Sequence, residues 1–412
     1  MPFRFLNLAL LLALIAPACQ YSQTKPKPKI TASRPQRSVE ASLSPYIDLL
    51  RRPDLAWNAR APHALNLPIS SETQQRRDAL EGMLKKYAPR IWWHPSDPFS
   101  PMDPLEFVKQ SSLWLRRTFG PDELISPRGQ VLAAELGFNH SKLYARNRAR
   151  FWGGVGTPLT PSGIIATAHA ADSFEVFDNK QDTDEEKNFY LKYEDPTLGT
   201  GQTRDWDLER LNGGRYTASL EQGRVPLFWR LGLNAEAHGY GRAPLGGERV
   251  LIEFWYHVPY SHATSYIVGN HQGDWEGMAM LVDLNLDKKG ALNHKLVAAF
   301  YAAHSDGRWH CPKELKWVDG HPEAFTALGS HATYNSAGRF DAGFITDETA
   351  RGRAWETWHN LAPMTLEPYY GFAGHWGEVR WLPHTSGPTA PGARSKWLPN
   401  QNSQARRLER CT

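Results

Sequence analysis

From Gly246 onward, the sequence is a succession of short apolar runs separated by turn-forming residues. The run 249–259 alternates in a way that places successive side chains on opposite faces of a strand. Further apolar runs cover 277–286 and 295–303, with Lys288-Lys289-Gly290 as the turn between them. Strands joined by turns rather than by long helices are typical of antiparallel packing. The sequence therefore predicts a mainly β fold, an antiparallel β-sandwich with a short N-terminal helical lead-in and long loops.

The composition and one helical segment complete this architecture. The 412 residues include 16 Trp, 33 Gly and 30 Pro, which favours a fold rich in turns. A helix is predicted from Ser71, where Ser71-x-x-Gln74 has a capping-box pattern and apolar residues recur at helical spacing until Pro89. The expected organisation is a signal peptide at 1–18, a tether at 19–45, the helical lead-in at 46–83, the sandwich at 84–400 with an insertion at about 120–245, and a tail at 401–412.

The first residues have the features of an export signal. Arg4 precedes an apolar stretch, 8–16, that is too short to cross a bilayer as a helix. Ala16-Pro17-Ala18 then places small residues ahead of Cys19. This pattern fits cleavage by signal peptidase, and it equally fits a bacterial lipobox in which Cys19 carries the lipid. The chain is predicted to be exported, and either lipid-anchored in a bacterial envelope or periplasmic or secreted.

The chain contains three cysteines. Apart from Cys19, the two others are Cys311 and Cys411. Two thiols in an oxidising compartment favour one disulfide, and the alternative is two unpaired thiols. We predict a bond between Cys311 and Cys411 that ties the last residues to the body of the chain.

The charge is nearly balanced, with 47 Lys and Arg against 43 Asp and Glu, a net charge of +4. A dedicated nucleic-acid-binding protein usually needs a concentrated basic face. We therefore expect no nucleic-acid partner, and no feature of the sequence indicates an oligomeric state.

The segment Gly269-Asn270-His271-Gln272-Gly273-Asp274-Trp275-Glu276-Gly277 carries the strongest chemical signal. In an extended strand, Asp274 and Glu276 point to one side, about 6–7 Å apart, with the tryptophan on the other. Two carboxylates at that spacing repel unless a cation neutralises them. His271 is expected in the turn before the strand, where Gly273 lets the backbone bend.

One imidazole and two carboxylates suit a water-bearing divalent cation. We therefore predict His271, Asp274 and Glu276 as cation ligands, with Ca²⁺ and Mg²⁺ favoured over Mn²⁺. The alternative is a strand end whose charges face water and whose tryptophan is buried.

Four further histidines occur near the predicted strands: His257, His262, His304 and His331. A single histidine is more often a hydrogen-bonded structural residue than a ligand. His262 and His304 are the candidates for additional metal ligands, and Glu276 and His304 are the candidates for a catalytic general base.

Further motifs accompany this segment in a fixed order. They are Tyr87-Ala88-Pro89-Arg90-Ile91-Trp92-Trp93-His94-Pro95, Phe99-Ser100-Pro101, His304-Ser305-Asp306-Gly307, His321-Pro322, Gly329-Ser330-His331-Ala332, Gly371-Phe372-Ala373-Gly374-His375-Trp376-Gly377, Gly387-Pro388 and the stretch 392–397. In this order they resemble the family of proteins related to yeast vacuolar protein sorting protein 62. The resemblance runs from about residue 84 to 397 and leaves 120–245 unmatched.

The same core is similar, at a greater distance, to the necrosis- and ethylene-inducing-peptide-like cytolysins. Their heptapeptide Gly-His-Arg-His-Asp-Trp-Glu would align with Asn270 to Glu276, where Gly273 replaces the second His. In the cytolysins, the first His, the Asp and the Glu hold a divalent cation on a β-sandwich. The resemblance implies these roles for His271, Asp274 and Glu276. A further Asp ligand of the cytolysins has no clear counterpart in the matching stretch 259–262, where His262 is the candidate replacement. His304 matches a functional histidine of the cytolysins, while the departures count against lipid-binding activity of the cytolysin type.

Three functions are compatible with these features. The main prediction is a divalent-cation-dependent binding module whose partner is a membrane or glycan surface, since some of the tryptophans could lie exposed. The alternative is a metal-dependent hydrolase acting on an envelope polymer or phosphoester. The sequence lacks a serine nucleophile elbow, a phosphate-binding glycine loop and a His-Glu-x-x-His motif, so no hydrolase class is indicated. A purely structural envelope protein stabilised by a cation is the third.

Overall fold

A computed structural model describes most of the chain from residue 40 onward. The described residues are 40–51, 70–117, 120–136, 189–194, 225–262, 270–379, 386–391, 408 and 411, without 234, 236–239, 246, 305, 342–345, 371 and 373. All of them belong to one compact unit, residues 38–412. The predicted signal peptide, Cys19, the tether before residue 40 and most of the insertion and tail lie outside the described residues.

Among the described residues before strand β1 are the helices α2 and α4. The predicted helix is confirmed as α4 (Ser71–Tyr87), and it buries Leu80, Met83, Leu84 and Tyr87. Its N-cap is Ser70 rather than Ser71, because the Ser70 side chain accepts the backbone N–H of Thr73 at 3.1 Å. Helix α2 (Glu40–Arg51) packs against α4 and begins inside the range that we assigned to the tether.

Within the described ranges, no helix combines the length and apolar character that crossing a bilayer requires.

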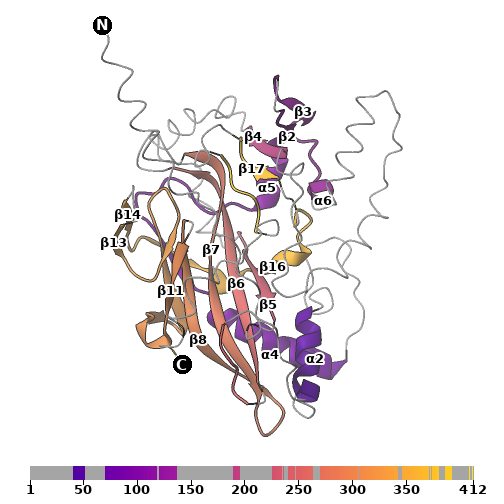
Figure 1. The fold of residues 1–412 in the computed structure, drawn as a ribbon, viewed down its shortest axis with the longest axis vertical. Helices are drawn as coiled ribbons and strands as arrows, with labels where there is room; N and C mark the ends of the chain where they lie inside the picture. The colour runs from indigo at the N-terminus through magenta and orange to yellow at the C-terminus, as the bar shows by residue number, and fades with distance from the viewer. Residues whose placement is uncertain are drawn as a thin grey trace, which may run out of the picture. The chain divides into compact units, whose positions relative to one another are not determined.

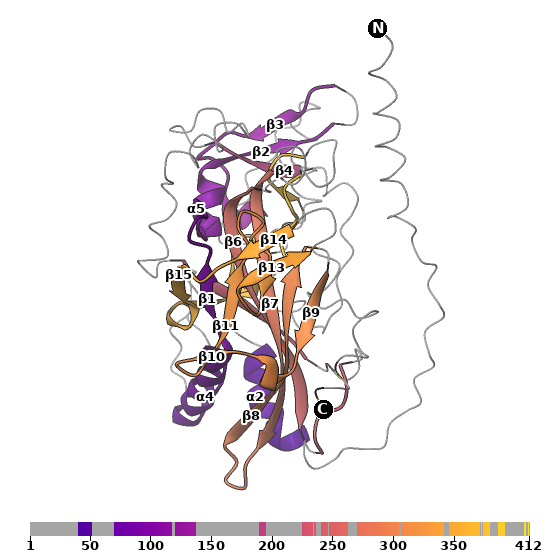
Figure 2. The ribbon, with the colours of Figure 1, turned by 90° about the vertical axis from the view of Figure 1, so that its left-hand side faces the viewer.

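A six-stranded sheet forms the centre of the fold (Figure 1). Its order is β16-β5-β6-β7-β8-β9. The strands are β16 (Leu361–Pro363), β5 (Leu227–Gly232), β6 (Glu248–Ser261), β7 (His271–Leu286), β8 (Leu292–Ala303) and β9 (Asp306–His310). The antiparallel pair β6–β7 runs from Glu248 opposite Leu284 to Ser261 opposite His271. The turn at 288–290 is confirmed, and β9 forms the edge of the sheet beside β8 (Figure 2).

The described residues also form three smaller sheets. The first has the order β10-β11-β1-β15 with β12 beside β11, the second the order β17-β4-β2-β3, and the third is the hairpin β13–β14. Their strands are β10 (Trp317–Val318), β11 (His321–Thr326), β1 (Arg90–Trp93), β15 (Arg353–Glu356), β12 (Thr333–Tyr334), β17 (His375–Trp376), β4 (Phe189–Tyr193), β2 (Ser111–Leu115), β3 (Glu123–Ser126), β13 (Gly338–Asp341) and β14 (Thr346–Thr349). Short helical turns are α5 (Pro104–Lys109), α6 (Ala133–Leu136), η4 (Pro312–Glu314), η5 (Thr357–His359) and η6 (Met364–Leu366).

The mainly β fold is confirmed, but its sheets are not purely antiparallel. Strand β1 pairs in parallel with β11, β16 with β5, and β17 with β4. The strands of each parallel pair are far apart in the sequence, as parallel pairing requires, whereas hairpin turns can join only antiparallel neighbours.

The main core lies between the central sheet and the sheet that contains β1. Trp93 on β1 and Trp355 on β15 both contact Tyr256 on β6, with ring centroids 5.8 and 6.0 Å apart. All three side chains are buried. Large aromatic side chains facing each other across two sheets are consistent with sandwich-like packing.

The opposite face of the central sheet is also apolar. Leu251 and Leu281 lie in a second buried cluster that includes Leu408. The predicted bond between Cys311 and Cys411 is confirmed and lies beside this cluster.

Candidate functional site

The predicted cation ligands lie at the start of strand β7. His271 is the first residue of the strand, so our expectation that it sits in a preceding turn was wrong. Asp274 pairs with Val258 and Glu276 with Tyr256 on the neighbouring strand. Both carboxylates therefore lie on one face of β7, and Trp275 is fully buried on the other. Asp274 is buried, whereas His271 and Glu276 are partly exposed.

Gly273 and Gln272 fix the start of this strand. Gly273 has φ +62°, and a Cβ atom at this position would lie 2.0 Å from the carbonyl oxygen of Trp376. The Gln272 side chain accepts the Tyr193 N–H at 3.0 Å and donates to the Tyr193 carbonyl at 3.1 Å. The side-chain amide of Gln272 thus pairs with the backbone of β4 as another strand would. Glycine is needed at position 273, because the backbone of β17 comes too close for a side chain.

The His271 ring bonds to its own strand. Nδ1 lies 2.7 Å from the Gly273 carbonyl oxygen, which can only accept a hydrogen bond, so Nδ1 carries the proton. In the neutral ring, the lone pair is then on Nε2. Histidines that bind metals commonly donate their second N–H to a backbone carbonyl in this way.

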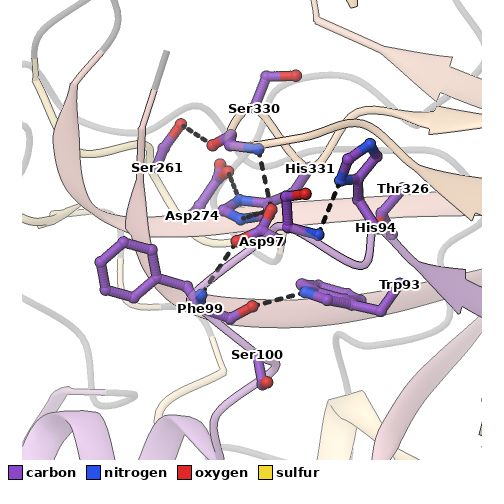
Figure 3. A network of polar contacts seen from close by, with 12 residues as sticks. Trp93, His94, Asp97, Phe99, Ser100, Ser261, Asp274, Thr326, Ser330 and His331 are labelled. Atoms are coloured by element: carbon purple, nitrogen blue, oxygen red, sulfur yellow. Dashed lines mark hydrogen bonds and ion pairs between the residues drawn. The ribbon is translucent and has the colours of Figure 1, made fainter. Parts of the chain in front are cut away.

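A buried ion network holds Asp274. Asp274 Oδ2 lies 3.1 Å from His331 Nδ1, and Asp97 Oδ2 lies 3.3 Å from Nε2 of the same ring (Figure 3). All three side chains are buried. One imidazole thus contacts two carboxylates that come from different parts of the chain.

The two carboxylates keep His331 protonated. Burial alone would lower the pKa of His331, but Asp97 and Asp274 together raise it to about 10. The backbone of His331 has φ +57°, which is uncommon for a residue other than glycine. Its carbonyl accepts the Tyr256 hydroxyl at 2.8 Å, and its ring stacks on Trp93 at 5.5 Å. These contacts lock the ring in the position that both carboxylates need.

Three consecutive residues, 329–331, each bind a different carboxylate. The Gly329 N–H donates to Asp97 at 2.9 Å, and the Ser330 hydroxyl donates to Asp347 at 2.8 Å. The third is the His331–Asp274 pair. This loop therefore joins the segment after β1, strand β14 and strand β7 at one place.

A second histidine–carboxylate pair adjoins the loop. His304 Nε2 lies 2.7 Å from Asp347, which also accepts the Tyr334 hydroxyl at 2.6 Å. Burial opposes the charge of His304, but the hydrogen bond and charge of Asp347 raise its pKa, and His304 in turn lowers the pKa of Asp347. The His304 side chain stays 33% exposed and its φ is +55°. It is thus a solvent-accessible imidazole with a fixed orientation.

His257 on β6 and His262 just after it are buried and have structural roles. The His257 ring contacts Phe107, Trp275 and Trp376 at 4.7, 5.0 and 5.1 Å, and burial lowers its pKa to about 3. His262 is buried, and its backbone N–H donates to the Gly329 carbonyl. His262 therefore supports the loop at 329–331 through its backbone.

In the described part of the chain, no three His, Cys, Asp or Glu side chains form a ready-made set of metal ligands. His271, Asp274 and Glu276 share the start of β7, and the cation itself stays a prediction. Burial raises the pKa of Tyr256 and of Tyr334, and the negative charge of Glu276 acts in the same direction on both. The charge of Asp274 favours the protonated form of His304, against the effect of burial.

Asp97 and Asp347 were not predicted as site residues from the sequence. Asp97 had a local signal: it precedes Pro98, and its Oδ1 accepts the Phe99 N–H at 3.0 Å, which is an Asx turn. That signal predicts a turn but not a partner 232 positions away, such as Gly329. Asp347 lies on a short hairpin strand that has no apolar periodicity.

Comparison with known proteins identifies part of this region. Residues 257–348 match the family model of Vps62, vacuolar protein sorting-associated protein 62. The predicted resemblance to this family is confirmed for these residues, whereas the similarity to the cytolysins stays a prediction. No curated protein and no solved structure matches the chain. The matched residues contain the start of β7, His304, the loop at 329–331 and Asp347, whereas Asp97 precedes them.

Proposed function

Because residues 257–348 are Vps62-like, we propose that this region carries a divalent-cation site and that the exported chain binds a membrane or glycan surface through it. The ligands are His271, Asp274 and Glu276. The observation that carries the proposal is the hydrogen bond from His271 Nδ1 to the Gly273 carbonyl, because it places the lone pair of the neutral ring on Nε2.

The charge around the strand supports the same conclusion. Asp97, Asp274, Glu276 and Asp347 are four carboxylates in one region of the fold. Carboxylate oxygens are the ligands that a hard divalent ion prefers, and Ca²⁺ and Mg²⁺ are such ions.

The kind of surface that the chain would bind follows from its proposed location at the envelope. An exported protein that is anchored through Cys19 stays next to the envelope, where lipid headgroups and glycans are the available surfaces. Most of the tryptophans in the described ranges are buried, and Trp93, Trp255, Trp275 and Trp376 fully so. Trp317 is 39% exposed and is available for contact with such a surface.

A calorimetric titration tests the cation site. Ca²⁺, Mg²⁺ and Mn²⁺ are titrated into the chelator-treated chain and into Glu276→Gln, which keeps the shape of a partly exposed ligand and removes its charge. We expect binding near 1:1 that weakens about 10-fold or more in Glu276→Gln. The matched control is Glu348→Gln, which removes an exposed carboxylate from β14. Equal affinity in all three proteins would contradict the proposal.

A metal-dependent hydrolase is the second candidate, and the His304–Asp347 pair favours it. An accessible imidazole oriented by a buried carboxylate is suited to act as a general base. Hydrolysis of bis-p-nitrophenyl phosphate by the cation-loaded chain, abolished in His304→Ala and reduced in Asp347→Asn, would support this function. A rate equal to that of the cation alone would exclude this phosphodiesterase activity.

Lipid anchoring has its own test. Expressed in bacteria, the intact chain should fractionate with membranes, and Cys19→Ser should move it to the soluble fraction. A soluble intact chain would favour plain cleavage after Ala18 and would leave the cation site unaffected.

A further inference from the structure

Lysine is unevenly distributed over the described part of the chain. Three lysines are paired with glutamates, namely Lys85, Lys109 and Lys192. The other lysines of the described ranges form no ion pair within those ranges, and all of them lie in three short segments. They are Lys86 at the end of α4, Lys288, Lys289 and Lys295 on the β7–β8 hairpin, and Lys313 and Lys316 between β9 and β10.

The C-terminal end of α4 brings these three segments together. The Tyr87 hydroxyl lies 2.9 Å from His294 Nδ1, which joins α4 to the start of β8. Nδ1 of His321 donates to the Ala88 carbonyl at 3.2 Å, which joins the same end of the helix to β11, the partner strand of β10. Figure 2 shows α4, β10 and the β7–β8 hairpin at one end of the central sheet. We call the six unpaired lysines and Trp317 the basic end.

The side chains of the basic end are open to solvent. All six lysines are exposed, and Trp317, which follows Lys316 directly, is 39% exposed. An indole beside ammonium groups suits the boundary between water and lipid, because the ring contacts the acyl region while the lysines contact phosphates. An uncharged glycan offers lysine no opposite charge, so the composition of this surface favours an anionic membrane.

Two acidic side chains at this end bind groups other than lysine ammonium groups. Asp287 Oδ1 accepts the backbone N–H groups of Lys289 and Ala291 at 2.8 and 2.9 Å. Asp319 pairs with Arg90 at 2.6 Å. The hairpin turn is thus held by its backbone and by Asp287, and its lysine side chains are left for an external partner.

We propose that the basic end docks on an anionic phospholipid surface, with the lysines at the lipid phosphates and Trp317 at the level of the headgroups. This surface is separate from the candidate cation site, because Lys288 follows the end of β7 whereas His271 begins it. The 16 residues of β7 span about 50 Å. Docking relies on the proposed export of the chain, which brings it to the envelope, but it needs no divalent cation.

The predicted lipid anchor is compatible with this orientation. The described residues closest in sequence to Cys19 are those of α2, and α2 packs against α4. A lipid on Cys19 would therefore tether the chain through the helix that adjoins the basic end. Each lysine near an anionic surface adds about fivefold to the affinity, so several lysines together can hold the fold against the bilayer.

Sedimentation with vesicles tests the proposal on the full chain carrying Cys19→Ser, which removes the predicted lipid. The chelator-treated chain is mixed with vesicles of phosphatidylcholine, alone or with about 30% phosphatidylglycerol. We expect at least about tenfold stronger binding to the anionic vesicles, and a loss of this preference as salt is raised.

Two charge-matched variants carry the decision, because basic residues before α2 are common to all the proteins compared. Lys288→Gln with Lys289→Gln should weaken binding to the anionic vesicles about tenfold or more. Lys109→Gln with Arg339→Gln removes the same charge from α5 and β13 and should weaken it about twofold or less.

Equal weakening in the two variants would overturn the proposal. Sedimentation with purified peptidoglycan but with neither vesicle would also overturn it, in favour of a glycan surface. The cation site is judged separately by the calorimetric titration. A chain that binds the cation but shows no lysine-dependent vesicle binding would refute the docking alone, and the reverse result would refute the cation site alone.

Discussion

Nδ1 of His331 lies 3.1 Å from the carboxylate of Asp274, and both side chains are buried. This pair connects the start of β7 to a loop that also binds Asp97 and Asp347. The candidate cation ligand Asp274 is therefore oriented by the protonated His331, and Glu276 and His271 are partly exposed.

Replacing His331 should be strongly destabilising. His331→Ala removes the imidazolium that lies between the buried carboxylates of Asp97 and Asp274, and breaking such a buried ion pair costs about 3–5 kcal/mol. The free energy of unfolding in urea measures the loss. The control is His359→Ala, whose side chain is 65% exposed and pairs with Glu356, so that it should cost less than about 1 kcal/mol. Similar losses in the two variants would contradict the role of His331.

The contribution of His331 should also depend on pH. Its pKa is raised to about 10 from the usual 6.5, so its protonated form stabilises the folded state fully below about pH 6.5. That stabilisation is lost as the pH rises from 6.5 toward 10. The difference in unfolding free energy between the chelator-treated natural chain and His331→Ala should therefore shrink from pH 6 to pH 10. A difference that stays constant or grows would show that His331 is not charged in the folded protein.

Gly273 should tolerate no side chain, in contrast to Gly290. Both have positive φ, +62° and +78°, so alanine pays a backbone cost of about 1 kcal/mol at either position. At Gly290 nothing lies within 4 Å, whereas at Gly273 the new Cβ atom would meet the Trp376 carbonyl oxygen at 2.0 Å. We expect Gly273→Ala to lower the unfolding free energy by about 2 kcal/mol or more beyond Gly290→Ala. Equal losses would mean that β17 does not press on the start of β7.

Much of the central sheet was predictable because its strands carry their own periodicity. The alternation along 249–259 reports a strand whose two faces have different neighbours, and β6 confirms it with both faces buried. The predicted start of β7 was too late, because a glycine often bends or weakens a strand. In this protein Gly273 lies inside the strand and permits the close approach of Trp376. The need for glycine at position 273 comes from a tertiary contact, and a local sequence pattern contains no information about such a contact.

The candidate site was predictable in part. The spacing of Asp274 and Glu276 places them on one face of a strand, and β7 has them there. The contacts of Asp274 with His331, and through His331 with Asp97, were not predictable. Asp97 comes before the strands β6 to β8 in the sequence and His331 comes after them, so no local pattern connects the two residues. The parallel pairs such as β1–β11 escaped prediction for the same reason, since no turn connects them.

The most direct measurement of the cation site uses paramagnetic Mn²⁺ and the histidine ring signals of the labelled chain in nuclear magnetic resonance. The ion broadens nuclei near it, so substoichiometric Mn²⁺ should broaden the ring signals of His271 first, while the exposed His359 keeps its linewidth. Excess Mg²⁺ should restore the His271 signal by competition, and Glu276→Gln should weaken the broadening. Equal broadening of His271 and His359, or none at either, would contradict a cation site formed by His271, Asp274 and Glu276.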